Sequence, residues 1–133
     1  PRSTLFPYTT LFRSMQELTE YFLERIKFAR VKGVLDQQII LDPGIGFGKR
    51  LQDNFQILRE LKKIADIGFP VLIGPSRKSF IGLTLDLPVD QRLEGTAAAV
   101  TTGILKGARI VRVHDVKEMK RVALITDAIR GIA

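Results

Sequence analysis

The sequence predicts an α/β fold built around a parallel sheet, with its elements in the order αβαβαβα. Short β-branched runs alternate along the chain with longer segments whose apolar residues recur at helical spacing. The β-branched runs also end abruptly in glycine, proline or polar residues, as buried strands do. Strands joined through helices pair in parallel with right-handed crossovers, which is typical of doubly wound folds and of (β/α)₈ barrels.

The predicted helices have apolar residues at steps of three and four, and glycines follow the first three of them. These helices span residues 15–32, 51–65, 92–106 and 117–132, and the predicted strands span 39–40, 71–74 and 110–113. The third helix is rich in small side chains, so it can approach the sheet closely. In the last helix the residues expected to face inward are Met119, Val122, Ala123, Thr126 and Ile129. Residues 83–91 have no clean period and predict a loop or a short helical turn.

Composition and charge limit the class of protein. The 133 residues are 45% hydrophobic, and no apolar run is long enough to span a bilayer, so we expect a soluble, cytoplasmic protein without a membrane partner. The absence of cysteine excludes disulfides and cysteine nucleophiles, and a single histidine argues against a zinc site. The net charge of +7 suggests an acidic partner. Because no basic stripe interleaved with aromatic residues is present, we expect a small anionic substrate and no nucleic acid.

The first 14 residues differ from the rest of the chain. They read PRSTLFPYTTLFRS, with two prolines, no acidic residue and no helical period. Residues 4–14 resemble the translation of a common DNA-sequencing adapter, although a natural disordered leader would also fit this composition. We therefore expect residues 1–14 to be a non-native, disordered leader that contributes nothing to the fold, and residues 15–133 to form the domain.

A glycine-rich stretch follows the first predicted strand and reads LDPGIGFGK over residues 41–49. Glycine allows a backbone to approach a ligand closely, and Pro43 has no N–H to continue a sheet. Asp42 then stands at the mouth of the strand. The stretch is not a phosphate-binding Walker loop, because Lys49 is followed by Arg50 instead of Ser or Thr. On its own it is equally consistent with a tight turn.

Polar residues also end the other two predicted strands. Residues 76–79 read SRKS, which suits an anion, and the third strand continues into Arg112 and His114, which are two positions apart and so share a face. The carboxyl ends of parallel strands meet at one edge, so we expect Asp42, Lys78, Arg112 and His114 to line one mouth. Taken singly, these features also fit a solvated basic loop and a structural histidine.

Together, the three stretches resemble one family. LDPGIGFGK, GPSRKSFIG and RVHDV, in this order and spacing, are similar to the C-terminal signature stretches of dihydropteroate synthase, a pterin-binding family. The resemblance covers residues 15–133 and implies the C-terminal portion of a (β/α)₈ TIM barrel, incomplete because three strands cannot close one. It further implies a transferase that condenses 6-hydroxymethyl-7,8-dihydropterin diphosphate with para-aminobenzoate. The products would be 7,8-dihydropteroate and diphosphate, in folate biosynthesis.

The resemblance implies substrate-binding roles for five residues of the first two stretches. Asp42 matches the carboxylate that accepts from the ring N–H and amino group of the pterin, and Lys78 matches the donor to its oxo group and ring nitrogen. Phe47, Arg77 and Ser79 match residues around the aminobenzoate, with its ring on the aromatic side chain and its carboxylate near the hydroxyl.

Catalysis and metal binding are implied in the same way. Arg112 and His114 match the substrate-binding pair near the ring and the departing diphosphate, and Lys78, Arg112 and His114 are the expected catalytic residues. Mg²⁺ is the implied cofactor, but the family's metal-binding asparagine has no counterpart in this chain, so no metal ligand is expected here. The alternative is an inactive half-barrel or a pterin-binding module without catalysis. Exposed barrel edges would favour a homodimer.

Overall fold

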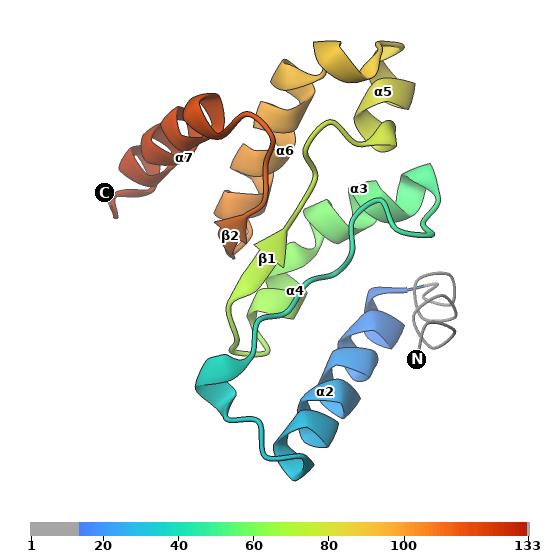
Figure 1. Ribbon diagram of the computed structural model, residues 1–133, viewed down its shortest axis with the longest axis vertical. Coiled ribbons are helices and arrows are strands. Elements are labelled where there is room, and N and C mark those ends of the chain that lie inside the picture. The colour runs from blue at the N-terminus through green and yellow to red at the C-terminus, as the bar shows by residue number, and fades with distance from the viewer. Residues whose placement is uncertain (1–13, 133) are drawn as a thin grey trace.

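The computed structural model describes residues 14–132, which form an open α/β unit around a short parallel sheet. Figure 1 shows β1 and β2 near the centre, with α6 and α7 beyond β2 and α2 at the opposite end. In chain order the elements are α2 (Met15–Val31), η2 (Asp36–Gln38), α3 (Leu51–Arg59), α4 (Leu61–Ala65), β1 (Val71–Ile73), α5 (Ser79–Leu85), η3 (Val89–Gln91), α6 (Leu93–Leu105), β2 (Ala108–Val111) and α7 (Val116–Arg130).

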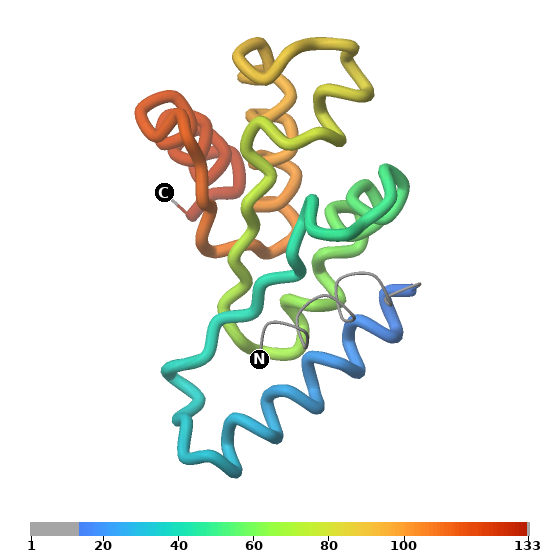
Figure 2. Tube along the Cα trace, turned by 45° about the vertical axis from the view of Figure 1, so that its right-hand side comes forward, coloured from blue at the N-terminus to red at the C-terminus, as the bar shows by residue number. Residues whose placement is uncertain are grey.

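The sheet confirms the predicted parallel pairing. β1 pairs with β2 in parallel, from Val71 opposite Ala108 to Ile73 opposite Val111. On the other side of β1, Leu41 forms a single parallel bridge to Val71. Figure 2 follows this segment as it leaves η2 and runs beside β1. The sheet does not close within the described residues, in agreement with an incomplete barrel.

The first predicted strand is wrong, because residues 39–40 form no ladder. The N–H of Ile39 donates to the carbonyl of Asp36 at 3.1 Å and so ends η2. Only Leu41 exchanges bonds with the neighbouring segment: its N–H donates to Pro70 at 2.9 Å, and its carbonyl accepts from Leu72 at 2.8 Å. Pro43 has no N–H, so the pairing cannot continue.

The third strand was predicted at residues 110–113, but the observed strand begins and ends earlier in the sequence. β2 covers residues 108–111, so Arg112 and His114 follow the strand and do not share one of its faces. The last ladder bond runs from the N–H of Arg112 to the carbonyl of Ile73 at 2.9 Å. Beyond this bond the N–H of His114 donates to the side-chain Oγ of Ser76 at 3.1 Å, and Pro75 has no N–H with which the segment after β1 could continue the ladder.

The helices agree broadly with the predicted ranges, and three details differ from the expectations. The predicted helix 51–65 breaks at Glu60, whose φ of −110° departs from helical geometry, giving α3 and α4. Residues 83–91, expected to be a loop or a short helical turn, hold the end of α5 and the turn η3, and α5 itself was not among the predicted helices. Ile129, expected inward, is 78% exposed; it lies in the last turn of α7, beyond Thr126, which is the last buried residue of that helix.

The core explains why α6 is rich in small residues. One cluster of buried apolar side chains joins α2, α3, α4 and β1, and a second, formed by Val100, Ile104 and Met119, joins α6 to α7. A Cβ on Gly103 would lie 2.1 Å from Cδ1 of Ile73, so α6 rests directly on β1 at this glycine. Among residues 14–132, none of the helices is both long and apolar enough to cross a bilayer.

The expected leader falls on residues 1–13, which lie outside the described part of the chain, and on Ser14. Ser14 does contribute to the fold: its Oγ accepts from the N–H of Glu17 at 3.1 Å and caps α2. The carbonyl of Ser14 also accepts from the N–H of Leu18 at 3.2 Å. Ser14 thus has a capping role, and the non-native origin of residues 1–14 stays a prediction.

Replacing the cap should destabilise the chain. We expect Ser14→Ala to lower the free energy of unfolding by about 1 kcal/mol, because the N–H of Glu17 loses its acceptor. Ser14→Asp keeps an acceptor at this position and should unfold near the wild-type midpoint. Thermal unfolding followed by circular dichroism measures both, and a Ser14→Ala midpoint equal to that of the wild type would show that the cap contributes nothing.

Candidate functional site

The loop after Leu41 is held by hydrogen bonds to its own backbone. Oδ1 of Asp42 accepts from the N–H of Gly44 at 2.8 Å, which fixes this carboxylate at the start of the loop. Nζ of Lys49 closes the loop from the other end, donating to the carbonyls of Gly44 at 2.9 Å and Phe47 at 3.2 Å. Gly44 and Gly46 have φ of 71° and 86°, a left-handed geometry that side chains disfavour.

Lys78, from the loop after β1, packs against this glycine loop. Its Nζ donates to the carbonyl of Ile45 at 2.5 Å and lies 4.3 Å from the centroid of the Phe47 ring. A Cβ on Gly46 would lie 2.5 Å from Cδ of Lys78, so the lysine stem occupies the space that glycine leaves open. The two loops therefore form one surface.

Charges from two neighbouring loops act on Lys78. Burial lowers the pKa of Lys78, the negative charge of Asp42 raises it, and the positive charge of Arg112 adds to the lowering. The residues that follow Leu41, β1 and β2 thus share one electrostatic environment. Asp42, Lys78 and Arg112 were predicted to meet at one edge of the sheet. The structure places Lys78 on the glycine loop, and a Cβ on Gly74 would lie 3.8 Å from Cβ of Arg112. Their roles as site residues stay predictions.

His114 is joined to the loop after β1 by Ser76. Oγ of Ser76 accepts from the backbone N–H of His114 at 3.1 Å and lies 2.7 Å from its Nδ1. Ser76 is only 4% exposed, whereas His114 is an exposed residue. The serine therefore anchors the histidine ring at one nitrogen.

Both the side chain and the backbone of Arg77 make polar contacts. Its guanidinium donates to both carboxylate oxygens of Asp115, at 2.7 and 3.2 Å, and this interaction lowers the pKa of Asp115. Its backbone is left-handed, with φ of 56°. Two side chains from the start of α6 hold this conformation: Thr96 accepts from the N–H of Arg77 at 3.0 Å, and Arg92 donates to its carbonyl at 2.8 Å.

The other predicted residues lie at the rim. Phe47 is 60% exposed beside Lys78, and Ser79 is exposed at the first position of α5. The structure thus joins Phe47 to Lys78 directly, whereas Arg77 faces Asp115 and Ser79 stands apart at the helix start.

Three residues that position the site were not among the predicted site residues. Ser76 and Asp115 anchor His114 and Arg77, and each is adjacent in sequence to a predicted residue, which is the only signal they give. Asn54 is 3% exposed and its Oδ1 accepts from the N–H of Gly46 at 2.8 Å. A polar residue inside the apolar stripe of the second predicted helix was a sequence signal for Asn54.

The residues around these loops do not form a magnesium site. Within residues 14–132 no three His, Cys, Asp or Glu side chains gather where they could hold a metal ion. The Asp115 carboxylate is paired with Arg77 through both oxygens, and the Asp42 carboxylate, with one oxygen bonded to the N–H of Gly44, interacts with the charges of Lys49 and Lys78. The neighbouring cations Lys49 and Lys78 further disfavour a divalent cation here. The arrangement instead suits a flat polar ligand that carries negative charge.

Comparison with known proteins agrees with this chemistry. The family model of pterin-binding enzymes matches residues 7–114. The chain is 49% identical over 116 residues to the dihydropteroate synthase of Clostridium beijerinckii, covering 86% of this chain and 43% of that protein. It is 47% identical over 114 residues to that of Bacillus subtilis, covering 86% of this chain and 40% of the relative. The chain therefore spans about two fifths of the length of these relatives.

Solved structures show the same partial match. The dihydropteroate synthase of Yersinia pestis superposes with a TM-score of 0.86 at 38% identity, over 88% of this chain and 55% of that one. The enzyme of Coxiella burnetii, solved in complex with pteroic acid, gives 0.85 at 37% identity, over 87% and 44%. These matches confirm that the open sheet is a portion of a (β/α)₈ barrel. By sequence and by fold, the chain belongs to the family of pterin-binding enzymes.

Proposed function

We propose that this chain forms the pterin- and aminobenzoate-binding part of a dihydropteroate synthase. This transferase would condense 6-hydroxymethyl-7,8-dihydropterin diphosphate with para-aminobenzoate, giving 7,8-dihydropteroate and diphosphate in folate biosynthesis. The observation that carries the proposal is the meeting of three loops around Lys78, with Asp42 and Arg112 acting on its charge. The complexes of related enzymes with pteroic acid and with a sulfonamide drug support it.

Asp42 and Lys78 would bind opposite hydrogen-bonding edges of the pterin. The bond from Gly44 orients the Asp42 carboxylate, which has further acceptor sites for the ring N–H and the amino group. The ammonium of Lys78 carries three donors, so it can keep its bond to Ile45 while donating to the pterin oxo group and ring nitrogen. Their spacing along two joined loops would select a ligand that offers donors and acceptors together.

The aminobenzoate would bind nearer the rim. The exposed ring of Phe47 offers an apolar face for the benzene ring. Ser79 would donate to the carboxylate from the start of α5, and Arg77, fixed by Asp115, would add positive charge on that side. The amine of the substrate would then face the carbon that carries the diphosphate.

Catalysis would rest on stabilising the departing diphosphate. Arg112 and His114 would place donors near the leaving group, and the positive charge of Lys78, bound to the pterin, would add to their stabilisation of the transition state. Departure of diphosphate leaves a pterin cation that the amine attacks, so no protein nucleophile is required. Mg²⁺, the proposed cofactor, would neutralise charge on the diphosphate. Because the described loops do not form its site, we propose that residues outside this chain bind it.

A second candidate is a pterin-binding module without catalysis. The open sheet and the lack of a metal-binding cluster among residues 14–132 favour it for the chain on its own. The exposed sheet edges would then favour association into a homodimer.

The isolated chain should lack synthase activity. We expect no measurable dihydropteroate from the purified 133-residue chain with both substrates and Mg²⁺ at ordinary enzyme concentration, because part of the pterin site and the metal site are not formed. Incorporation of labelled para-aminobenzoate measures the product, with the Bacillus subtilis enzyme as positive control. Robust turnover by the chain alone would contradict this prediction and exclude the second candidate.

Lys78→Ala should remove catalysis without unfolding the protein. In a chain completed with the N-terminal part of a relative, we expect the substitution to reduce transition-state stabilisation by about 2 to 4 kcal/mol, measured as kcat/KM. The unfolding midpoint should barely change, since a half-buried loop lysine contributes little to the core.

The matched control for this prediction is Lys62→Ala, which removes a lysine whose ammonium pairs with Asp66 on the exposed side of α4. It should leave kcat/KM unchanged. Full activity in the completed Lys78→Ala enzyme would refute the assignment of this loop to the pterin site.

A further inference from the structure

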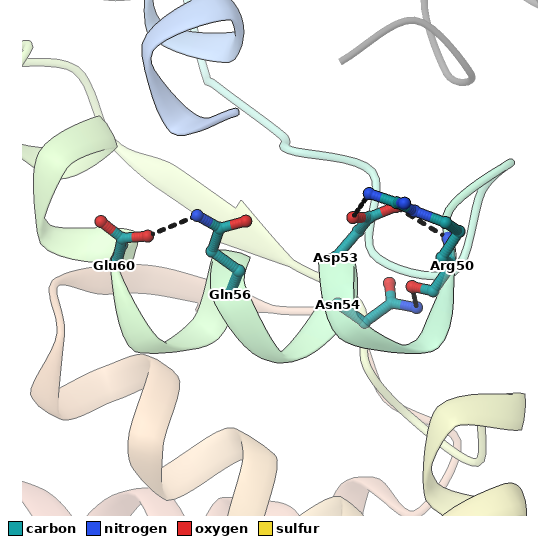
Figure 3. Close-up of polar contacts among 5 residues, drawn as sticks. All are labelled: Arg50, Asp53, Asn54, Gln56 and Glu60. Carbon is teal, nitrogen blue, oxygen red and sulfur yellow. Dashed lines mark hydrogen bonds and ion pairs between the residues drawn. The ribbon is translucent and has the colours of Figure 1, made fainter. Parts of the chain in front are cut away.

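Asn54 is a polar side chain on the buried face of α3, and both ends of its amide are bonded. Its Oδ1 accepts from the N–H of Gly46 at 2.8 Å, and its Nδ2 donates to the carbonyl of Arg50 at 3.2 Å. Figure 3 shows the second of these bonds, with the side chain turned back toward the first turn of the helix. The two partners need opposite ends of the amide, so they fix its orientation.

The bond from Asn54 reaches the same peptide group that binds Lys78. The N–H of Gly46 and the carbonyl of Ile45 belong to one planar, trans peptide, so they point in opposite directions. Asn54 accepts from the N–H side, and Nζ of Lys78 donates to the carbonyl side at 2.5 Å. Hydrogen bonds aligned through one amide polarise each other, so each bond strengthens the other.

This peptide would be free to rotate without such an anchor. Rotation changes ψ of Ile45 together with φ of Gly46, and the latter, which is 86°, is an angle that glycine can vary at little cost. The Ile45 side chain is fully buried and does not follow the rotation. A rotated peptide would turn the Ile45 carbonyl away from Lys78 and leave the ammonium without this acceptor.

We propose that Asn54 is a positioning residue for Lys78 and acts through the Ile45–Gly46 peptide. The inference deepens the proposed function, because the importance of the Lys78 position rests on its proposed role as pterin donor. The contact itself does not depend on any ligand. Asn54 therefore sets where the donor stands before the substrate arrives.

Two substitutions separate positioning from simple packing. Asn54→Leu keeps a similar volume and removes the acceptor for Gly46, whereas Asn54→Asp keeps that acceptor and places an oxygen against the Arg50 carbonyl. Both should lower the unfolding midpoint, but only Asn54→Leu should release Lys78. If Asn54→Leu does not fold, Asn54→Ala removes the acceptor without adding bulk.

The matched control is Gln56→Leu, on the same helix. The amide of Gln56 donates to Glu60 at 2.9 Å, toward the far end of α3 from the glycine loop (Figure 3). This substitution removes an amide from α3 and leaves the Ile45–Gly46 peptide untouched.

The experiment measures hydrogen exchange in the ¹⁵N-labelled 133-residue chain without ligand. The two signals are the ammonium protons of Lys78, assigned by their loss in Lys78→Arg, and the amide proton of Gly46. The pH is kept well below the pKa of lysine so that all ammonium groups stay protonated. In Asn54→Leu we expect the Lys78 ammonium protons and the Gly46 amide proton to exchange about threefold faster or more than in the wild type. In Asn54→Asp and in Gln56→Leu both signals should exchange at a rate near that of the wild type.

An unchanged exchange rate of the Lys78 ammonium in Asn54→Leu, compared with Gln56→Leu, would overturn the proposal. Because no pterin is present, this result is independent of the proposed function. Binding of pteroic acid to the completed chain tests that function separately, and its failure would leave the exchange result standing.

Discussion

Contact between the Lys78 side chain and the backbone at Gly46 is the constraint on which the site depends. A Cβ at Gly46 would lie 2.5 Å from the lysine stem, so the two loops can meet only because this residue is glycine. The contact brings the ammonium to the Ile45 carbonyl and onto the Phe47 ring. It also buries part of a cation, which lowers the pKa of Lys78 and makes the group responsive to the charges of neighbouring loops.

Glycines also allow close approaches among the elements behind the site. Gly103 lets α6 rest on Ile73, and Arg92 and Thr96 at the start of α6 hold Arg77 in its left-handed conformation. A Cβ on Gly82 would lie 2.2 Å from Nη2 of Arg92, so a glycine in α5 makes room for that arginine. The loop after β1 is therefore shaped by close backbone approaches from the helices behind it.

The general arrangement of helices and strands can be predicted from the sequence, because periodicity and glycine placement are local signals. The apolar spacing of residues 15–32 and the glycines after three predicted helices were sufficient to predict the fold class. The errors arose where partners distant in sequence decide the outcome. Residues 39–40 have strand-forming side chains, but the N–H of Ile39 donates to Asp36 in a 3₁₀ turn. The pairing of β2 ends with the bond from Arg112, because Pro75 has no N–H to continue it.

The sequence indicated the charged residues of the candidate site, but it did not indicate the residues that hold them in place. The strand-end positions of Asp42, Lys78 and Arg112 follow from the alternation of elements, whereas the roles of Asn54, Ser76 and Asp115 depend on which backbone groups reach them. No local pattern specifies that Asn54 accepts from Gly46, eight residues earlier in the chain. Each of the three side chains bonds to a group that lies at least eight positions away in the sequence.

The two polar pairs between the loops after β1 and β2 also bear on how the chain folds. Ser76 meets His114 and Arg77 meets Asp115, and both pairs join residues 38 positions apart. Closing such a loop reduces the chain entropy, and most of this loss occurs when the first of the two pairs forms. The second pair then forms almost without further entropic cost, so the pairs should assemble as a unit. Contacts this distant in sequence form late compared with helical turns, which places completion of the site among the last cooperative steps of folding.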